Sequence, residues 1–352
     1  MSTKKMLVLL GLLLVSAVLF TACAGPAGEQ GPAGPAGPAG PAGPAGPAGE
    51  SVTADNLTCT ECHNDTALLE SKIYPWEGSR HGTTGLAWEE EAGNAGCAGC
   101  HAGSSFVDMV AAGQNFLDYP KTEGLVLPGA TPQTCRTCHT IHTTYTTEDF
   151  ALRTVAPVTM AISGETFDKG MGNLCANCHQ ARRYMANFAA KDAAGAVIAG
   201  QIDVSTRFNP HLSNQADMLL GVGGGGDVAG SPAAHYSMVE NSCVTCHLGE
   251  SANHFFAAEV SACVACHADA ESTDINGKVT EIQGKFDALK AALTEAGKLN
   301  EEGSPIATKG VAEADAFPIW VYGYIMEDGS MGVHNPKYAS ALLDAALAAL
   351  GK

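Results

Sequence analysis

The sequence predicts a mainly α-helical fold with much irregular structure and little β-sheet. Residues 51–275 contain few long apolar runs and few alternating strand patterns, and aromatic residues make up only 6% of the chain. Residues 276–352 instead carry apolar side chains at helical spacing. A short cysteine and histidine motif recurs six times within residues 51–275. We therefore expect that region to be organised around bound groups rather than around a core of side chains.

The recurring motif is Cys-x-x-Cys-His, the attachment signature of c-type haem. Its two thiols add to the haem vinyl groups, and the histidine that follows becomes the proximal ligand of the iron. A single Cys-x-x-Cys also serves zinc sites and thioredoxin-like redox pairs, but six copies, each followed by histidine, favour six haem c cofactors. Numbered one to six along the chain, the motifs are Cys59-Cys62-His63, Cys97-Cys100-His101, Cys135-Cys138-His139, Cys175-Cys178-His179, Cys243-Cys246-His247 and Cys263-Cys266-His267.

Six of the twelve histidines lie outside the motifs, which equals the number of sixth coordination positions on six irons. We predict that they are distal ligands, and interpret the methionines, the competing axial ligands, as packing residues. Because His142 follows His139 by three residues, we expect it to bind the iron of a neighbouring haem. The six candidate distal ligands are His81, His142, His211, His235, His254 and His334.

Iron with histidine on both sides has no open position for a substrate, so the sequence favours electron transfer and predicts no catalytic residue. Two alternatives stay open. One is a reductase of small nitrogen or sulfur oxyanions, in which one iron lacks its distal histidine. The other is a structural role, in which subunits polymerise into a conductive filament.

The N-terminal residues 1–22 predict an export leader, with Lys4 and Lys5 before an apolar run that is short for a membrane span. The run ends in a Phe-Thr-Ala-Cys sequence that resembles a bacterial lipobox, which predicts lipidation of Cys23. The alternative is a cleaved leader that leaves Cys23 as a spare thiol. Lipidation would anchor the exported chain to a membrane. The expected location is therefore the outer membrane and periplasm, or the cell surface.

Residues 23–50 form a low-complexity segment in which glycine recurs at every third position from Gly25 to Gly49. Most triplets read Gly-Pro-Ala, a pattern that resembles collagen. We expect a semi-rigid polyproline II stalk, and a trimer wound through a collagen-like stem is the alternative.

The formal charge is −18, and removing the two lysines of the leader lowers it to −20. Nucleic acid is excluded as a partner because binding it requires a basic face. Other cytochromes with basic patches, extracellular metal acceptors or bound cations suit an acidic surface, although acidity also serves solubility alone.

The C-terminal residues 276–352 predict a helical hairpin. One helix spans Lys278 to Leu299, and the other begins at Asn335-Pro336, since proline is favoured in a first turn. Between them, Ile319 to Ile325 is expected to be a short strand or extended segment. We expect the hairpin to close over a haem through His334, and a dimerising coiled coil is the alternative.

Two segments resemble known proteins. The tandem of motifs five and six, with His254 and two phenylalanines between them, resembles the paired motifs of multihaem cytochromes c from metal-reducing bacteria. The segment from Asp328 to Tyr338 is similar to one in the multihaem nitrite reductase group, where the corresponding histidine is a haem ligand followed by a long helix. This resemblance implies the same role for His334. The Cys-x-x-Cys-Lys motif common in those reductases is absent here, which favours a respiratory electron-transfer lipoprotein.

Overall fold

A computed structural model of the protein describes residues 67–82, 91–118 and 131–352. The predicted leader, the lipidation site at Cys23, the stalk and motif one (Cys59, Cys62 and His63) lie outside the described residues, and the domain boundaries remain predictions. Among the helices of the described part, none combines the length and apolar character needed to cross a membrane.

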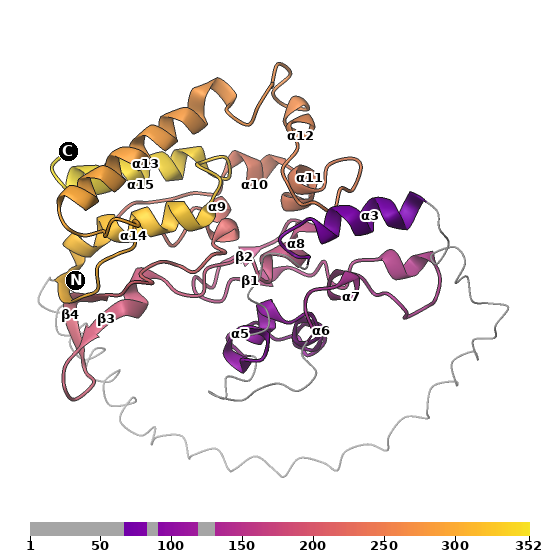
Figure 1. Cartoon of the computed structure of the whole chain (residues 1–352), viewed down its shortest axis with the longest axis horizontal. Coiled ribbons are helices and arrows are strands. Elements are labelled where there is room, and N and C mark those ends of the chain that lie inside the picture. Colours follow the sequence, from indigo (N-terminus) through magenta and orange to yellow (C-terminus); the bar gives the residue numbers. More distant parts are fainter. Residues whose placement is uncertain (1–66, 83–90, 119–130) are drawn as a thin grey trace, which may run out of the picture. The chain divides into compact units, whose positions relative to one another are not determined.

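The described part of the chain is helical, with long irregular connections and two small sheets (Figure 1). This agrees with the predicted fold class. Short 3₁₀ helices occur at Thr147–Phe150, Met185–Phe188 and Ile275–Gly277. The α-helices are α3 (Ala67–Glu77), α5 (Ala95–His101), α6 (Gly103–Ala111), α7 (Cys135–Cys138), α8 (Gly172–Ala176), α9 (Gln215–Leu220), α10 (Ala234–Met238), α11 (Cys243–His247), α12 (Val260–Val264), α13 (Lys278–Glu295), α14 (Glu313–Asp328) and α15 (Pro336–Ala349).

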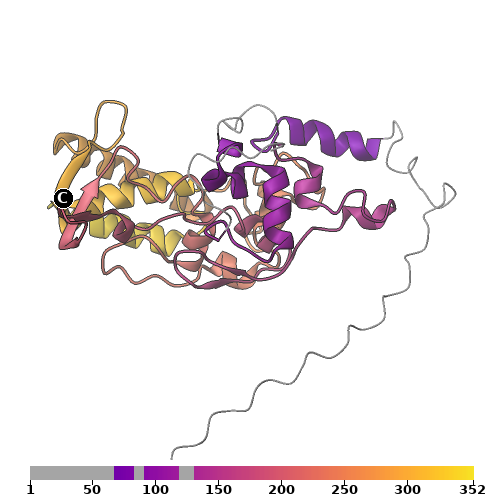
Figure 2. The ribbon, with the colours of Figure 1, turned by 90° about the horizontal axis from the view of Figure 1, so that it is seen from below.

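The three longest helices, α13, α14 and α15, pack together at the end of the described part drawn at the left of Figures 1 and 2. Both predicted C-terminal helices are confirmed, and α15 begins as expected with a proline in its first turn behind the Asn335 cap. However, α14 packs against both of them, so a three-helix unit stands where a two-helix hairpin was expected.

The prediction of a strand or extended segment at Ile319 to Ile325 is wrong, because these residues lie in the middle of α14. A continuous apolar run fits a buried strand and a buried helix equally well, and length distinguishes them. Here the buried run extends from Ala316 to Ile325, which is too long for a typical strand. Two acidic residues in the first turn and Gly329 in a left-handed conformation after the last turn favour the helix.

The largest apolar core lies around these three helices and includes Trp320, Tyr324 and Leu289. It also takes in Phe208 and Met218 from earlier in the chain. Two smaller clusters lie among the motif helices, and they contain Met160 and Met109 respectively. Most of the apolar burial is therefore C-terminal, while the segment that carries the motifs has only small cores.

The two sheets are antiparallel and short. In one, β1 (Val158–Thr159) pairs with β2 (Thr166–Phe167), with Val158 opposite Phe167. In the other, the order is β3 (Ala189–Lys191), β4 (Val197–Val204) and β5 (Thr308–Ala312). Strands β4 and β5 pack against α14, so this sheet covers one side of the C-terminal core.

A buried carboxylate on α9 joins this helix to the segment after motif four. Asp217 accepts hydrogen bonds from the Tyr184 hydroxyl (2.5 Å) and from the Ala181 N–H (2.7 Å). Burial raises the pKa of Asp217 to about 6, although both hydrogen bonds oppose the rise. The ionised carboxylate is therefore less stable in the folded chain than in water.

We predict that the contribution of Asp217 to the free energy of unfolding falls as pH rises from 4 to 6. The folded state binds the Asp217 proton more tightly than the unfolded chain, whose aspartate pKa is about 3.9, so rising pH deprotonates the unfolded chain first and favours it. The fall from this residue amounts to about 3 kcal/mol or less. Guanidinium unfolding of the wild type and Asp217→Asn at pH 4 and pH 6.5 measures it. Equal pH dependence in the two proteins would contradict the prediction.

Candidate functional site

The five motifs within the described residues each form one helical turn. Motifs two and five lie in α5 and α11, and motifs three, four and six cross the ends of α7, α8 and α12. Where a helix ends inside a motif, the histidine N–H still donates to the first cysteine's carbonyl, as His267 does to Cys263 (2.8 Å). Because positions i, i+3 and i+4 share one face of a helix, both thiols and the imidazole project from the same side of the turn.

Each of the five motif histidines in the described residues lies beside one of the predicted distal histidines. The ring centroids are 6.0–6.4 Å apart in all five pairs, and the ring planes cross at 35° to 85°. None of the ten described cysteines forms a disulfide. The pairs are His179 with His81, His101 with His211, His139 with His254, His267 with His235 and His247 with His334.

The spacing of the paired rings leaves room for one metal ion. Two metal–imidazole bonds of about 2.0 Å each, extended to the ring centres, require a centroid separation of roughly 6 Å. Ordinary aromatic contacts also occur at this distance, so the distance alone does not distinguish a metal site from ring packing. The one-to-one matching of motif histidines with predicted distal histidines favours a metal site, because ring packing has no reason to select these partners.

A pair of histidines is what a haem iron requires, since the porphyrin supplies its other four ligands. A metal held by protein alone in a structural site takes four side chains. Within the described ranges, no group of three or more histidine, cysteine, aspartate or glutamate side chains is arranged to hold a metal ion. The paired imidazoles and the neighbouring thiols therefore fit a covalently attached haem.

Hydrogen bonds orient six of the ten paired rings through their Nδ1 atoms. Metal-binding histidines typically donate this N–H to a carbonyl or carboxylate, which leaves the Nε2 lone pair for the metal. Every pair except His101 with His211 contains at least one ring held in this way. The acceptors are the carbonyls of Phe150 for His139, Val333 for His235, Phe256 for His247 and Ala252 for His254, the Gln215 side chain for His179, and the Asp328 carboxylate for His334.

The pair His101 and His211 is oriented differently. The Nδ1 atom of His101 is buried and lies 3.2 Å from the Glu91 carboxylate, without hydrogen-bond geometry. His211 lies in a loop after Pro210 and adopts a left-handed backbone conformation with φ of 77°. Such a conformation costs a residue with a side chain roughly 1 kcal/mol, and strain of this kind concentrates at functional sites.

Burial keeps several of the paired rings neutral. It lowers the pKa of His81 and of His211 to about 4 in each case, with nearby cationic or imidazole groups adding to the effect. Burial alone would also lower the pKa of His334, but the Asp328 carboxylate raises it above the usual value. A neutral imidazole has the free lone pair that a metal ligand needs.

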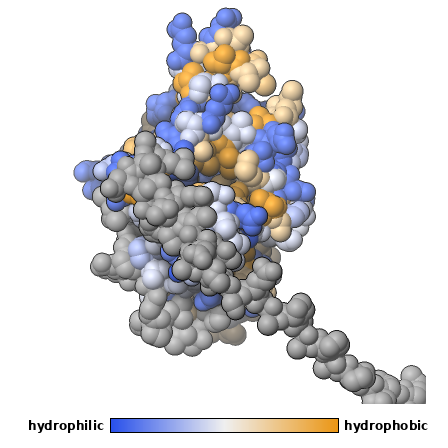
Figure 3. Space-filling view, turned by 90° about the vertical axis from the view of Figure 1, so that its right-hand side faces the viewer, coloured by the Kyte–Doolittle hydropathy of each residue, from blue (hydrophilic) through white to orange (hydrophobic). Residues whose placement is uncertain are grey.

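Phe256 connects three of the histidine pairs. Its ring meets His81 edge to face at a centroid distance of 4.8 Å and lies 5.7 Å from His254, while its carbonyl accepts from His247. On the same side, Lys72 of α3 donates to the Ser251 carbonyl (2.5 Å) and so holds the helix that precedes His81 against this loop. Figure 3 shows small apolar and hydrophilic patches interspersed on one face of the molecule.

Thiol contacts link motif four to its neighbours. The sulfur atoms of Cys100 and Cys178 lie close together, and so do those of Cys175 and Cys243. Cys138 of motif three packs against the same apolar cluster as Cys100 and Cys178. Helix α11 in turn packs against α8 and α12. Motif four therefore adjoins motifs two, three and five, and motif six follows motif five.

The remaining distal candidate, His142, lies in a loop built around a single carboxylate. Its ring stacks on Tyr145 at a centroid distance of 5.4 Å. The buried Asp149 side chain accepts from four successive backbone N–H groups, those of residues 142 to 145. Burial alone would raise the pKa of Asp149, but these bonds hold it at about 2. Motif one, whose histidine could not be compared with His142, lies outside the described residues.

Three side chains that support the site were not identified from sequence. Gln215 and Asp328 hold the rings of His179 and His334, and Phe256 touches three pairs. Of these three, only Asp328 could have been suspected from the sequence, because it lies six residues before His334 in the segment that resembles the reductase group. Of the six methionines within residues 51–275, four are buried in apolar clusters, as expected of packing residues, and they are Met109, Met160, Met185 and Met218. Met171 and Met238 are exposed instead.

We predict that Asp149→Ala loosens the loop that carries His142. The substitution removes the acceptor of four backbone N–H groups, so these amides should exchange with solvent at least tenfold faster. Hydrogen exchange followed by mass spectrometry measures this in the protein with its cofactors bound. Glu148→Ala is the control, because it removes a neighbouring exposed carboxylate that does not hold the loop. The same exchange in both variants would refute the assignment.

No protein-family model and no curated protein matches this chain. Among solved structures, the chain is similar to that of the outer cell wall cytochrome OcwA, with 23% sequence identity and a TM-score of 0.42. The similarity covers 78% of this chain and 49% of the other, so this chain spans about half the length of its structural neighbour.

Proposed function

We propose that this protein transfers electrons through six covalently bound c-type haems and binds no substrate at its irons. The observation that carries the proposal is the pairing of histidines. Every motif histidine in the described residues has one distal candidate at a ring distance of 6.0–6.4 Å. With an imidazole on each side of the iron, all six coordination positions are taken.

Haem supplies a one-electron ferric–ferrous couple, and the protein supplies the rest. In each motif the two thiols would attach the haem, and the following histidine would hold its iron together with the distal histidine. The Nδ1 hydrogen bonds keep the paired rings in one orientation and one tautomer. Since neither ligand has to leave or enter, little rearrangement accompanies a change of charge.

The sixth centre belongs to motif one, and we assign His142 as its distal ligand. The other five distal candidates pair with motifs two to six. The loop around Asp149 positions His142 three residues after His139, so the centres of motifs one and three would be neighbours. This assignment follows the sequence-based expectation that His142 serves a haem other than that of motif three.

Motif four is proposed as the junction of the relay. Its thiols contact those of motifs two and five, and it shares an apolar cluster with motif three. The ring of Phe256 touches His81, the partner of motif four, and His254, the partner of motif three. Three arms would therefore meet at motif four: one at motif two, one through motif three to motif one, and one through motif five to motif six.

The exposed cysteines indicate where redox partners reach the relay. Among the ten described cysteines, Cys135 of motif three and Cys266 of motif six are exposed. A pocket beside motif six is lined by His267 and by the carboxylates of Asp269 and Glu271, among others. An acidic rim suits a basic patch on a partner cytochrome or a cationic acceptor.

The cellular setting of the proposal comes from the N-terminal sequence. An export leader, a lipid on Cys23 and a Gly-Pro-Ala stalk would hold the haem domain away from a membrane surface. A role in anaerobic or extracellular respiration fits such an arrangement.

Growth with a radiolabelled fatty acid tests the anchor, because label should enter the wild type and not Cys23→Ala.

The variant His254→Ala tests the ligand assignment. Removing one imidazole should open the iron of motif three, so that the reduced protein binds one equivalent of carbon monoxide while the wild type binds none. Absorbance titration measures the stoichiometry, and a mass measurement verifies that all six haems remain attached. Phe255→Ala, which removes the exposed ring next to His254, is the control and should bind none. Stoichiometric binding by the wild type would favour the alternative of a reductase.

We also predict that the rim carboxylates speed electron transfer to a cationic acceptor at motif six. The double variant Asp269→Asn and Glu271→Gln should lower the rate constant about two- to fivefold at low salt, and the difference should shrink at high salt. The control is Glu301→Gln with Glu302→Gln, an equal charge change beyond the far end of the 18-residue helix α13. Equal decreases of the rate constant in both double variants would contradict the prediction, because the net charge alone would then explain them.

A further inference from the structure

We propose that Asp328 gives the haem between His247 and His334 the lowest reduction potential of the five centres whose histidine pairs the structure describes. The inference rests on the proposed function, because it concerns how this chain tunes one haem of the relay. Asp328 is not a ligand itself. It acts through the ring of His334, whose Nδ1 atom lies 2.6 Å from its Oδ1 atom.

The hydrogen bond from His334 differs from those of the other oriented rings in the charge of its acceptor. His139, His235, His247 and His254 donate to backbone carbonyls, and His179 contacts a side-chain amide. Among the ten paired rings, only His334 meets a carboxylate with hydrogen-bond geometry. A hydrogen bond to an ionised acceptor is about twice as strong as a neutral one. It also raises the basicity of the imidazole as a ligand.

Burial preserves the effect of this charge. The Asp328 side chain is 1% exposed, whereas the Glu91 carboxylate near His101 is 41% exposed and lacks hydrogen-bond geometry. Solvent screens the charge of an exposed carboxylate, and such contacts contribute little. Of the two centres that have a carboxylate beside a ring, the one at His334 should therefore be shifted much further.

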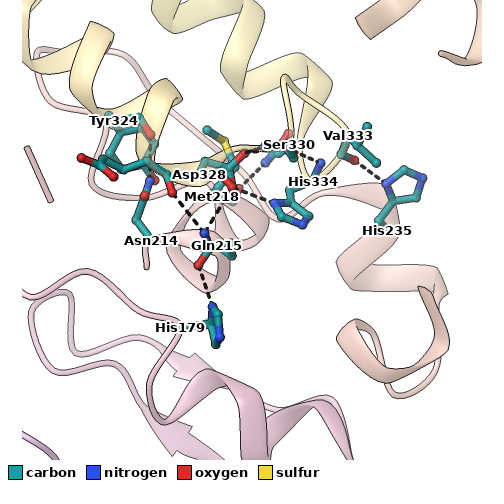
Figure 4. A network of polar contacts seen from close by, with 12 residues as sticks. His179, Asn214, Gln215, Met218, His235, Tyr324, Asp328, Ser330, Val333 and His334 are labelled. Carbon is teal, nitrogen blue, oxygen red and sulfur yellow. Dashed lines mark hydrogen bonds and ion pairs between the residues drawn. The ribbon is translucent and has the colours of Figure 1, made fainter. Parts of the chain in front are cut away.

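A network fixes the Asp328 carboxylate in place (Figure 4). Its second oxygen accepts from the hydroxyl and the backbone N–H of Ser330. Its backbone carbonyl accepts from Gln215 Nε2 (3.2 Å), whose Oε1 atom meets His179 Nδ1 (3.0 Å). Downstream, Gly332 adopts φ of 89°, and a side chain there would collide with Ile282. The loop from Asp328 to His334 is thus held at both ends.

The direction of the shift follows from charge. A more basic imidazole donates more electron density and favours the ferric over the ferrous iron, and second-shell hydrogen bonding is a known determinant of haem potential. The centre of motif five, which adjoins motifs four and six, should therefore be the last of the five described centres to accept an electron. The relay would carry an energetic step between its junction and its exposed end at motif six.

The test is a spectroelectrochemical titration of the full-length protein with its haems at pH 8. In Asp328→Asn, the midpoint potential of one centre should rise by at least about 59 mV, which for one electron corresponds to a tenfold change in its reduction equilibrium. The control is Asp217→Asn, which removes an equally buried carboxylate whose partners are a tyrosine hydroxyl and a backbone N–H. It should shift no single centre by that amount.

A second variant predicts the opposite sign. Ser330→Ala removes a hydroxyl that draws charge from Asp328, so the same centre should move to a lower midpoint. Unchanged midpoint potentials in Asp328→Asn, or shifts equal to those of the control, would overturn the inference. If Asp328→Asn does not fold, a higher midpoint potential in Ser330→Ala would overturn it.

Failure of the proposed function is distinguished by electron paramagnetic resonance of the wild type, because an iron with an open position would appear there as high-spin iron.

Discussion

Two imidazole rings separated by the room for one iron form the unit on which the motif-bearing part of this chain depends. Each pair joins segments that are far apart in sequence, such as His81 with His179 or His139 with His254. The apolar clusters between the motif helices are small, so the side chains there bury little surface of their own. Porphyrin faces bound between the rings would supply the missing apolar contact, and we expect folding of this region to require haem attachment.

The C-terminal unit serves these centres as a scaffold. Its three helices contain the largest apolar core, and the loop between α14 and α15 carries His334. The same loop offers the Val333 carbonyl to His235 and the Asp328 carboxylate to His334. A rigid helical core is a suitable place for both contacts, because ligand rings need orientations that a loop without support would not hold. The part of the chain that holds no motif therefore supplies one predicted distal ligand, His334, and the contacts that orient the rings of His235 and His334.

The local features of the site could be predicted from the sequence, and its tertiary contacts could not. The motif turns follow from the spacing of cysteine and histidine, and the count of leftover histidines indicated distal ligands. Which histidine meets which motif is decided by how distant segments pack, and no spacing encodes it. The segment from Ile319 to Ile325 was mistaken for a strand because a run buried on all sides has no periodicity to read. The resemblance of the Asp328 to His334 segment gave a role to the histidine alone.

Low-temperature electron paramagnetic resonance of the fully oxidised wild type tests the central claim most directly. If an imidazole occupies both axial positions of every iron, spin integration should yield six low-spin ferric haems per chain and no high-spin component. One equivalent of high-spin ferric haem in the native protein would mean an iron with an open or weakly held position. That result would contradict the account of a relay and favour chemistry at that centre.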